Sequence, residues 1–344
     1  LINEPGSTLK GLPEKPRLSI RKRENEFFTK YIQEFRIEEL LNQDSAAQDT
    51  EAKTNIIQNA KLFYETIDEY FPTQEEVTAF GTFLVQRCFL VAVSTPDRQS
   101  AFRIFSVLNS RGLSLQTTDI VKASIIGAVP PDKEDSYNDK WENMEISVGR
   151  HDFNELFGHI HMILVKSKAR RSLAEEYEDI ILDKLTAKKA MNFVDDTLVP
   201  YCEAYQAIRD SNYLASSGAD EVNAILRCLN RIDNSDWIPV AMSFYHRHKS
   251  DSDLMYTFLK KLERLAAFMR ITSWDVHYRV DRYSKVLTDI EQYEIGPSID
   301  LTEEEISKFV AQLNADVYRM ASNKRNYLLL RLDSLISDGS ASYD

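Results

Sequence analysis

Four side chains that could bind an anion or contact a catalytic neighbour lie in one stretch, FRIFSVLNSRGLSLQTTDIVKASIIG, at residues 102–127. They are Asn109, Arg111, Asp119 and Lys122. An arginine and a lysine on either side of a turn can bind phosphate, the arginine through two parallel hydrogen bonds. A local role is also open, in which Asn109 and Arg111 form hydrogen bonds within the turn and Lys122 extends along the surface or pairs with Asp119. The residue types therefore leave a ligand site and a structural turn as alternatives.

The first half of this stretch is predicted to be an amphipathic helix that stops at a glycine. Phe102, Phe105 and Leu108 recur at helical spacing, so they share one face. Gly112 follows at a position where a helix end needs a residue that accepts a positive φ. The letters NSRG thus predict a helix stop with a left-handed turn.

The second half is predicted to be a buried helix. It starts at Gln116 or Thr117, where Asp119 places a carboxylate in the first turn, close to the free backbone amides and the positive end of the helix dipole. The letters IVKASIIGAV that follow are apolar on almost every face, which is typical of a buried helix. Lys122 is the single charge in them.

The rest of the chain predicts a mainly α fold, a multi-helix array. Among 344 residues there are 10 glycines and 10 prolines, and the apolar spacing repeatedly fits a period near 3.6. Residues 17–20, RLSI, are predicted to be a short strand or an extended arm, and a helix follows from Glu24 with Phe35 on its apolar face. Capping boxes predict helix starts at Thr73 and Thr302. Further helices are expected at 139–145, 152–166, 173–185, 187–208, 220–231, 237–247, 251–269 and 275–294.

The clearest interruption along the chain is VPPDKEDSYND, at residues 129–139. Two adjacent prolines and a polar, charged run favour a linker over a helix. The sequence therefore predicts two parts, residues 1–130 and residues 131–344.

The opening stretch, extended by one residue to AFRIFSVLNSRGLSLQTTDIVKASIIG, resembles a signature of the GmrSD-type family of modification-dependent (type IV) restriction endonucleases. In that family the signature follows a ParB-like N-terminal segment that hydrolyses nucleotide. Gln116 departs from the pattern, because the family usually has a capping serine or threonine there, and the cap is expected to shift to Thr117. The positions that match the family pattern are Phe105, Leu108, Asn109, Arg111, Gly112, Leu115, Asp119 and Lys122.

Weaker resemblances cover much of the remaining chain. PRLSIRKRENEFFTKYI is similar to the arm and helix before the signature, HIHMILVKSKARRSLAEEYED to a helix of the middle region, and NYLLLRLDSLI to the segment before a C-terminal HNH nuclease domain. Neither a DGQQR-like motif nor an HNH motif occurs in the sequence. The resemblance therefore implies the helical middle of such a protein, with residues 1–130 as the C-terminal part of the N-terminal domain type and residues 131–344 leading toward an HNH domain.

The resemblance also implies a function. The parent protein would be a nucleotide-dependent DNA endonuclease that uses a nucleoside triphosphate and Mg²⁺ to defend against foreign or modified DNA. This chain would carry no catalytic residue and no cofactor of its own and would be inactive alone. Its nucleotide-site support residues would be Asn109, Arg111, Gly112, Asp119 and Lys122. The alternative is a non-catalytic helical scaffold for protein partners.

Charge and motifs narrow the other possibilities. The formal charge of -12 opposes a surface that binds nucleic acid everywhere, so DNA contact must be local. Two basic runs could provide it: KSKARR, with candidates Lys166, Lys168, Arg170 and Arg171, and RLSIRKR, with Arg21 and Arg23. A solvated helix end is the simpler explanation for each run. GxxxxGK[ST], GxGxxG and GxSxG are all absent, which removes the common phosphate-loop and nucleophile-elbow chemistries.

The sequence suggests no metal site, membrane span or disulfide. The pairs His159 with His161 and His246 with His248 are two residues apart, so on a helix neither pair shares a face. The three cysteines show no CxxC spacing and are expected to be buried free thiols. No stretch approaches the roughly 18 apolar residues of a membrane helix and no signal peptide is evident, so the cytoplasm is expected; no oligomeric state is predicted.

Overall fold

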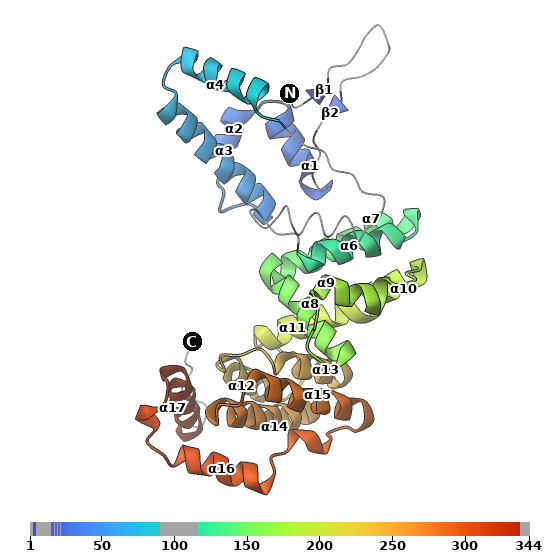
Figure 1. Cartoon of the computed structure of the whole chain (residues 1–344), viewed down its shortest axis with the longest axis vertical. Helices are drawn as coiled ribbons and strands as arrows, with labels where there is room; N and C mark the ends of the chain where they lie inside the picture. The colour runs from blue at the N-terminus through green and yellow to red at the C-terminus, as the bar shows by residue number, and fades with distance from the viewer. Residues whose placement is uncertain are drawn as a thin grey trace. The chain divides into compact units, whose positions relative to one another are not determined.

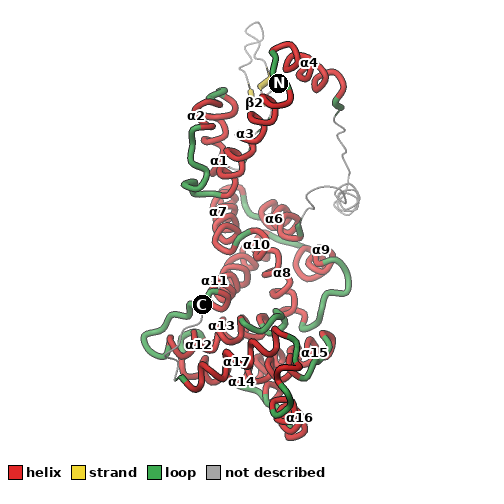
Figure 2. Tube along the Cα trace, turned by 90° about the vertical axis from the view of Figure 1, so that its left-hand side faces the viewer, coloured by secondary structure: helices red, strands yellow, loops and turns green. Residues whose placement is uncertain are grey.

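The computed structural model describes residues 3–4, 15–16, 18, 20, 22–89 and 116–337. The protein is mainly α, which confirms the predicted fold class, and helices account for most of the trace in Figure 2. Its contacts divide the chain into two compact units, Leu1–Ala101 and Phe102–Asp344. None of the described helices combines the length and apolar character that a membrane crossing requires.

The first unit contains a short ribbon followed by helices. Strands β1 (Asn3–Glu4) and β2 (Lys15–Pro16) pair antiparallel, so the strand lies just before the predicted 17–20. The helical segments are α1 (Lys22–Phe28), the π-helical η2 (Thr29–Gln33), α2 (Ile37–Leu41), α3 (Glu51–Tyr70) and α4 (Gln74–Arg87), coloured blue to cyan in Figure 1.

This unit has a small core and a largely uncovered helical hairpin. Tyr31, Leu40 and Ile57 form its buried cluster. Beyond this cluster, the second half of α3 and all of α4 carry no buried residue, and many of their large apolar side chains are exposed. These exposed side chains are Leu62, Phe63, Tyr64, Ile67, Tyr70, Phe83, Leu84 and Val85, which we call the α3–α4 apolar face.

The second unit is a helical array from green to red in Figure 1. Between residues 150 and 292, each expected helix begins and ends within three residues of the observed helix or run of consecutive helical segments. Its elements are α6 (Thr117–Ala128), α7 (Pro131–Val148), α8 (Arg150–Val165), α9 (Leu173–Tyr177), η4 (Glu178–Leu182), α10 (Ala187–Asn192), η5 (Phe193–Leu198), α11 (Val199–Arg209), α12 (Ala219–Asn230), α13 (Ile238–His248), α14 (Ser252–Ile271), α15 (Val276–Gln292), η6 (Pro297–Ile299), α16 (Glu303–Leu313), η7 (Val317–Arg319) and α17 (Ser322–Ile336).

One continuous core runs through this array. At the α7–α8 side, the rings of Trp141, Phe153 and Phe157 meet with centroids 5.5 to 5.8 Å apart. Farther along, Phe244 of α13 stacks on Phe258 of α14. Aromatic side chains each bury a large apolar area, so these contacts fix how the successive helices pack.

The expected linker at 129–139 is wrong, because α7 begins within it. Pro131 occupies the first turn of α7, where its missing N–H costs nothing and its fixed φ suits a helix. Asp132 and Glu134 then meet the positive end of the helix dipole. The interruption shrinks to Val129 and Pro130, whose ψ values are both 143°. The assignment of residues 1–130 and 131–344 to different family regions stays a prediction.

Two smaller expectations also fail, whereas the capping boxes are confirmed. The first helical run ends at Gln33, and Phe35 has φ 56° and an exposed ring, so it lies on no helix face. Cys88 is exposed, whereas Cys202 and Cys228 are buried. The boxes that begin at Thr73 and Thr302 both form as the sequence predicts.

Candidate functional site

The structure describes two of the five predicted nucleotide-site residues. Asp119 and Lys122 both lie on α6. Asn109, Arg111 and Gly112 lie outside the described residues, and so does the predicted helix stop. The geometry of the candidate site is therefore the geometry of α6 and its neighbours.

The carboxylate of Asp119 accepts a hydrogen bond at the start of its own helix, α6. The helix begins at Thr117, one of the two starts that the sequence allowed, and Gln116 keeps the cap position, which does not shift to Thr117. The backbone N–H of Gln116 donates to Asp119 Oδ2 over 3.1 Å. Asp119 thus satisfies a free amide at the helix start, as its place in the first turn predicts.

Lys122 is bound to a helix outside the opening stretch. Its Nζ lies 3.0 Å from Oε1 of Glu142 on α7, and not beside Asp119 as the local alternative predicted. The side chains of Lys122 and Glu142 are only 18% and 6% exposed. Asn138, one turn before Glu142, donates to the same oxygen over 3.0 Å. The single lysine of the apolar helix therefore forms a largely buried, hydrogen-bonded ion pair.

A second, more exposed pair joins α6 to α8. Arg150 Nη2 lies 3.4 Å from Asp119 Oδ2, the oxygen that also accepts from Gln116. These side chains are 48% and 27% exposed, so solvent weakens this pair. Helix α6 packs on α7, α8, α9 and α10 (Figure 1), and charged contacts reach the first two of these helices.

The basic run at 166–171 forms the loop after α8, and α15 holds its beginning. Lys166 adopts a left-handed backbone at φ 56°, and its Nζ lies 2.8 Å from Glu291. Its carbonyl oxygen accepts a hydrogen bond from the Ser284 hydroxyl. Glu291 also lines a surface hollow with Arg247 and His248.

The end of this loop is held by Glu176 of α9. Its Oε1 accepts hydrogen bonds from the backbone N–H groups of Arg170 and Arg171, each over 3.1 Å. Its Oε2 lies 3.3 Å from Nε2 of the buried His161. The two backbone bonds lower the pKa of Glu176, because they favour its charged form.

The candidate DNA contacts therefore fall into two groups. Lys166 pairs with Glu291, and the Arg171 side chain pairs with Asp179. Within the described ranges, no ion pair is formed by the Lys168 or Arg170 side chain. Arg21 lies outside the described residues, and Arg23 lies on α1.

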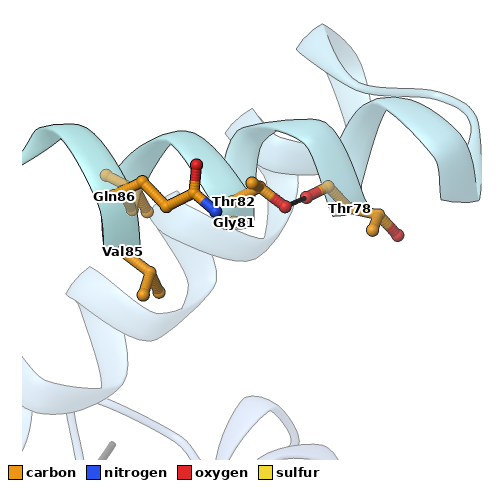
Figure 3. A pocket seen from close by; sticks show the side chains of 6 residues that line it. Thr78, Gly81, Thr82, Val85 and Gln86 are labelled. Carbon is orange, nitrogen blue, oxygen red and sulfur yellow. Dashed lines mark hydrogen bonds between the residues drawn. The ribbon is translucent and has the colours of Figure 1, made fainter.

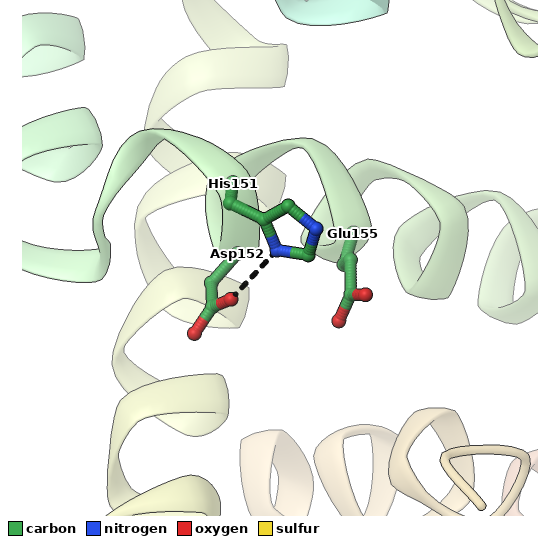
Figure 4. Close-up of side chains that lie close together, drawn as sticks. All are labelled: His151, Asp152 and Glu155. Atoms are coloured by element: carbon green, nitrogen blue, oxygen red, sulfur yellow. Dashed lines mark hydrogen bonds and ion pairs between the residues drawn. The ribbon is translucent and has the colours of Figure 1, made fainter.

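A histidine and two carboxylates come together at the start of α8. His151, Asp152 and Glu155 have possible ligand atoms within 4.8 Å of one another, and His151 Nδ1 lies 3.1 Å from Asp152 Oδ1 (Figure 4). The His151 side chain is 83% exposed. The positive end of the α8 dipole disfavours a cation at this place. The group could supply metal ligands, but nothing else in its surroundings indicates a metal.

In the first unit, a shallow hollow follows one face of α4. Thr78, Gly81, Thr82 and Val85 line it, and the Thr82 hydroxyl donates to the Thr78 carbonyl (Figure 3). All of its lining residues belong to α4, and none of these residues is charged. This surface is suited to packing against another apolar surface and not to binding a charged ligand.

Sequence reasoning missed the partners of the predicted residues. Glu142 and Arg150 lie 20 and 31 residues from the residues that they contact, and nothing in their local spacing predicts either contact. Glu176 lies in the acidic run EEYED, and nothing in the spacing of that run predicts its contacts with Arg170, Arg171 and His161. The neighbouring capping box of Ser172 and Glu175 predicts the start of α9 but not the contacts of Glu176.

Comparison with known proteins agrees with the motif. Residues 8–126 match the family model described as GmrSD restriction endonuclease, N-terminal domain. Searches of curated proteins and of solved structures found no match. The matched segment ends within α6, so Glu142 and Arg150 lie beyond it.

Proposed function

We propose that the chain is the helical core of a restriction protein, because residues 8–126 match the GmrSD restriction endonuclease N-terminal domain family. In this role it braces a ParB-like nucleotide-hydrolysing site and an HNH nuclease, for which the sequence carries no motif. The parent protein would use a nucleoside triphosphate and Mg²⁺ to cut foreign or modified DNA.

The observation that carries this proposal is the attachment of α6. This helix bears the motif residues Asp119 and Lys122, and both are engaged by side chains of the following helices. Because Glu142 neutralises Lys122, the lysine supports a neighbouring site by fixing α6 and not by offering a free charge to phosphate. The residues before α6 would supply the groups that contact nucleotide, with Asn109, Arg111 and Gly112 among them.

The α3–α4 apolar face supports the same assignment. Large apolar side chains are exposed along both helices, and extensive exposed apolar surface on a soluble protein usually marks a place that packs against another surface. We assign it to the ParB-like segment of the parent protein, which would cover the face and complete the domain.

The same face favours a second candidate function, a non-catalytic scaffold that binds protein partners. The two candidates differ in their response to nucleotide. A brace for a nucleotide site predicts that MgATP or MgGTP binds once the chain is joined to a ParB-like segment, whereas a pure scaffold predicts no response.

The first experiment measures binding of the chain to labelled duplex DNA, modified and unmodified, by fluorescence anisotropy at low and moderate salt. We expect salt-dependent binding through Lys168 and Arg170, whose side chains form no ion pair with the described part of the chain. Replacing both with alanine should lower the slope of log K against log salt by about 2, since each contact to phosphate contributes about one unit.

A matched control removes the same charges elsewhere. Lys260→Ala with Arg264→Ala changes one lysine and one arginine on the exposed side of α14 and should leave the slope unchanged. Equal losses in the two double variants would assign binding to net charge, and absence of binding at low salt would place DNA recognition in other domains. Incubation of the chain with Mg²⁺ and modified plasmid should give no cleavage; robust cleavage would contradict its role as a brace.

A further inference from the structure

Helix α6 belongs to the matched family segment by sequence and to the second unit by packing. The match ends at residue 126, inside a helix that runs to Ala128. The same helix lies against α7, α8, α9 and α10. The residues that fix this helix are therefore partly outside the segment that defines the family.

We propose that Glu142 is a positioning residue for the motif helix, acting through Lys122. It lies on α7, beyond the family match, and its carboxylate fixes the position of α6. The inference rests on the proposed function, in which α6 supports a nucleotide site. It adds that the helical unit, and not the family domain alone, sets the position of that helix.

Because both side chains are largely buried, this ion pair opposes movement of α6. The Lys122 ammonium and the Glu142 carboxylate are 3.0 Å apart, with side chains 18% and 6% exposed. At such low exposure neither charge is well hydrated, so each depends on the other for its stabilisation. A rotation or slide of α6 would separate the pair and leave two poorly hydrated charges.

The Glu142 carboxylate is also oriented by a residue of its own helix. Asn138 lies one turn earlier on α7 and donates to the same Glu142 oxygen over 3.0 Å. The acceptor therefore has one preferred position on a rigid helix, whereas the lysine has a flexible four-carbon stem. The fixed partner of the pair is Glu142, and the one that it holds is α6.

A weaker contact acts in the same direction at the start of the helix. Arg150 meets Asp119 over 3.4 Å at a partly exposed site, and Asp119 already closes the first turn of α6. Arg150 contributes less than Glu142, because solvent screens its charge. Two contacts about one turn apart on α6 define both its rotation and its position along its axis.

Hydrogen exchange of the full chain tests the positioning role. Glu142→Gln should speed exchange of the α6 amides at least about tenfold through local opening, while amides of α12 and α14 change by less than about threefold. Glu142→Asp retains the charge but withdraws it by one methylene, and should speed α6 exchange less. If the two sets of amides change equally in these folded variants, Glu142 contributes only general stability and the proposal is wrong.

Lys140→Met is the matched control on the same helix. Lys140 forms an ion pair with Asp195, away from α6, through side chains 43% and 38% exposed. This variant should leave α6 exchange within about twofold of the unmodified chain. Faster α6 exchange in this control would show that any charge change on α7 disturbs α6, which would also overturn the proposal.

A second readout separates this inference from the proposed function. MgATP and MgGTP are titrated against the chain joined to a ParB-like segment and against the same fusion with Glu142→Gln, at a temperature where both are folded. Glu142→Gln should weaken nucleotide binding at least about fivefold, the lower range of typical coupling between sites. Equal affinity overturns the positioning role and leaves the proposed function standing. If the unmodified fusion binds neither nucleotide, the proposed nucleotide role fails, and hydrogen exchange decides the role of Glu142.

Discussion

Two ion pairs of helix α7 involve residues only two positions apart, Lys140 and Glu142, and differ mainly in their exposure. Glu142 holds Lys122 of α6 with side chains 6% and 18% exposed, whereas Lys140 holds Asp195 with side chains 43% and 38% exposed. The second pair is the shorter, at 2.6 Å against 3.0 Å. Distance alone would rank the two pairs in the wrong order.

The difference shows how solvent decides the role of a charged side chain. An exposed pair exchanges good hydration for a weak attraction and contributes little. A buried pair is not necessarily stabilising as a whole, but removal of one partner leaves a charge that water cannot reach. Lys122 is thus committed to a structural role by its surroundings, although its residue type and position suggested a ligand contact.

The largest expected effect comes from Lys122→Met. This change leaves the Glu142 carboxylate without its cation and should lower the free energy of unfolding by about 3–5 kcal/mol. Chemical denaturation followed by circular dichroism measures the change. A loss below about 1 kcal/mol would remove the distinction between the two pairs, because it would match an exposed pair.

A pH experiment extends the comparison to two histidines of α8. Burial and the nearby positive charge of Arg209 lower the pKa of His159 to about 4. The unfolded chain therefore binds this proton near pH 6.5, before the folded chain does, and stability falls as the pH drops from 6.5 toward 4. The loss should reach about 3 kcal/mol, from 1.36 kcal/mol per pKa unit.

His159→Leu should remove this part of the pH dependence between pH 7 and pH 4.5. His151→Gln, which changes an exposed histidine two turns earlier, should retain it. Denaturation midpoints of the three proteins at both pH values give the result. An unchanged slope in His159→Leu would show that other groups produce the acid sensitivity.

Lys140→Met should have a small effect. Because both partners are exposed, the expected loss is about 0–1 kcal/mol, and it should shrink further as salt is added. Denaturation at low and high salt measures both quantities. A loss as large as that of Lys122→Met would contradict the rule that exposure separates the two pairs.

The smallest effect is expected at Glu176, at the end of the basic loop. Hydrogen bonds from the Arg170 and Arg171 backbone lower its pKa, so its contribution is complete above its ordinary pKa and is lost as the pH falls through the lowered value. Glu176→Gln should therefore be less stable than the unmodified chain at pH 7 and equal to it at strongly acid pH. A difference that persists at acid pH would assign the effect to packing and not to charge.

Much of the fold follows from local patterns. The capping boxes at Thr73 and Thr302 predicted helix starts because a hydroxyl and a carboxylate three residues apart satisfy each other's amides. Regular apolar spacing placed the helices between residues 150 and 292. Pro131 shows the limit of this reasoning. A proline disrupts a helix when it lies in the interior but is favoured in the first turn, so its presence alone does not tell a linker from a helix start.

The candidate site was less accessible to sequence reasoning. The motif identified Asp119 and Lys122, and the family match covers both. It could not identify Glu142 and Arg150, because contacts across 20 and 31 residues leave no periodic trace. The basic loop was similar: the sequence shows its cations, but Lys166 and Arg171 form ion pairs with Glu291, Glu176 and Asp179, which only the structure places beside them.

By itself the sequence determined the mainly α fold class, most helix ends and the family resemblance of residues 8–126, because these depend on interactions within a few residues or on a contiguous motif. Tertiary structure decided which charges are available. Lys122 and Lys140 are equally charged and both lie on helices, yet one is largely buried against Glu142 and the other remains near water. Hydration depends on what packs around a side chain, and that environment is assembled from helices distant in the sequence.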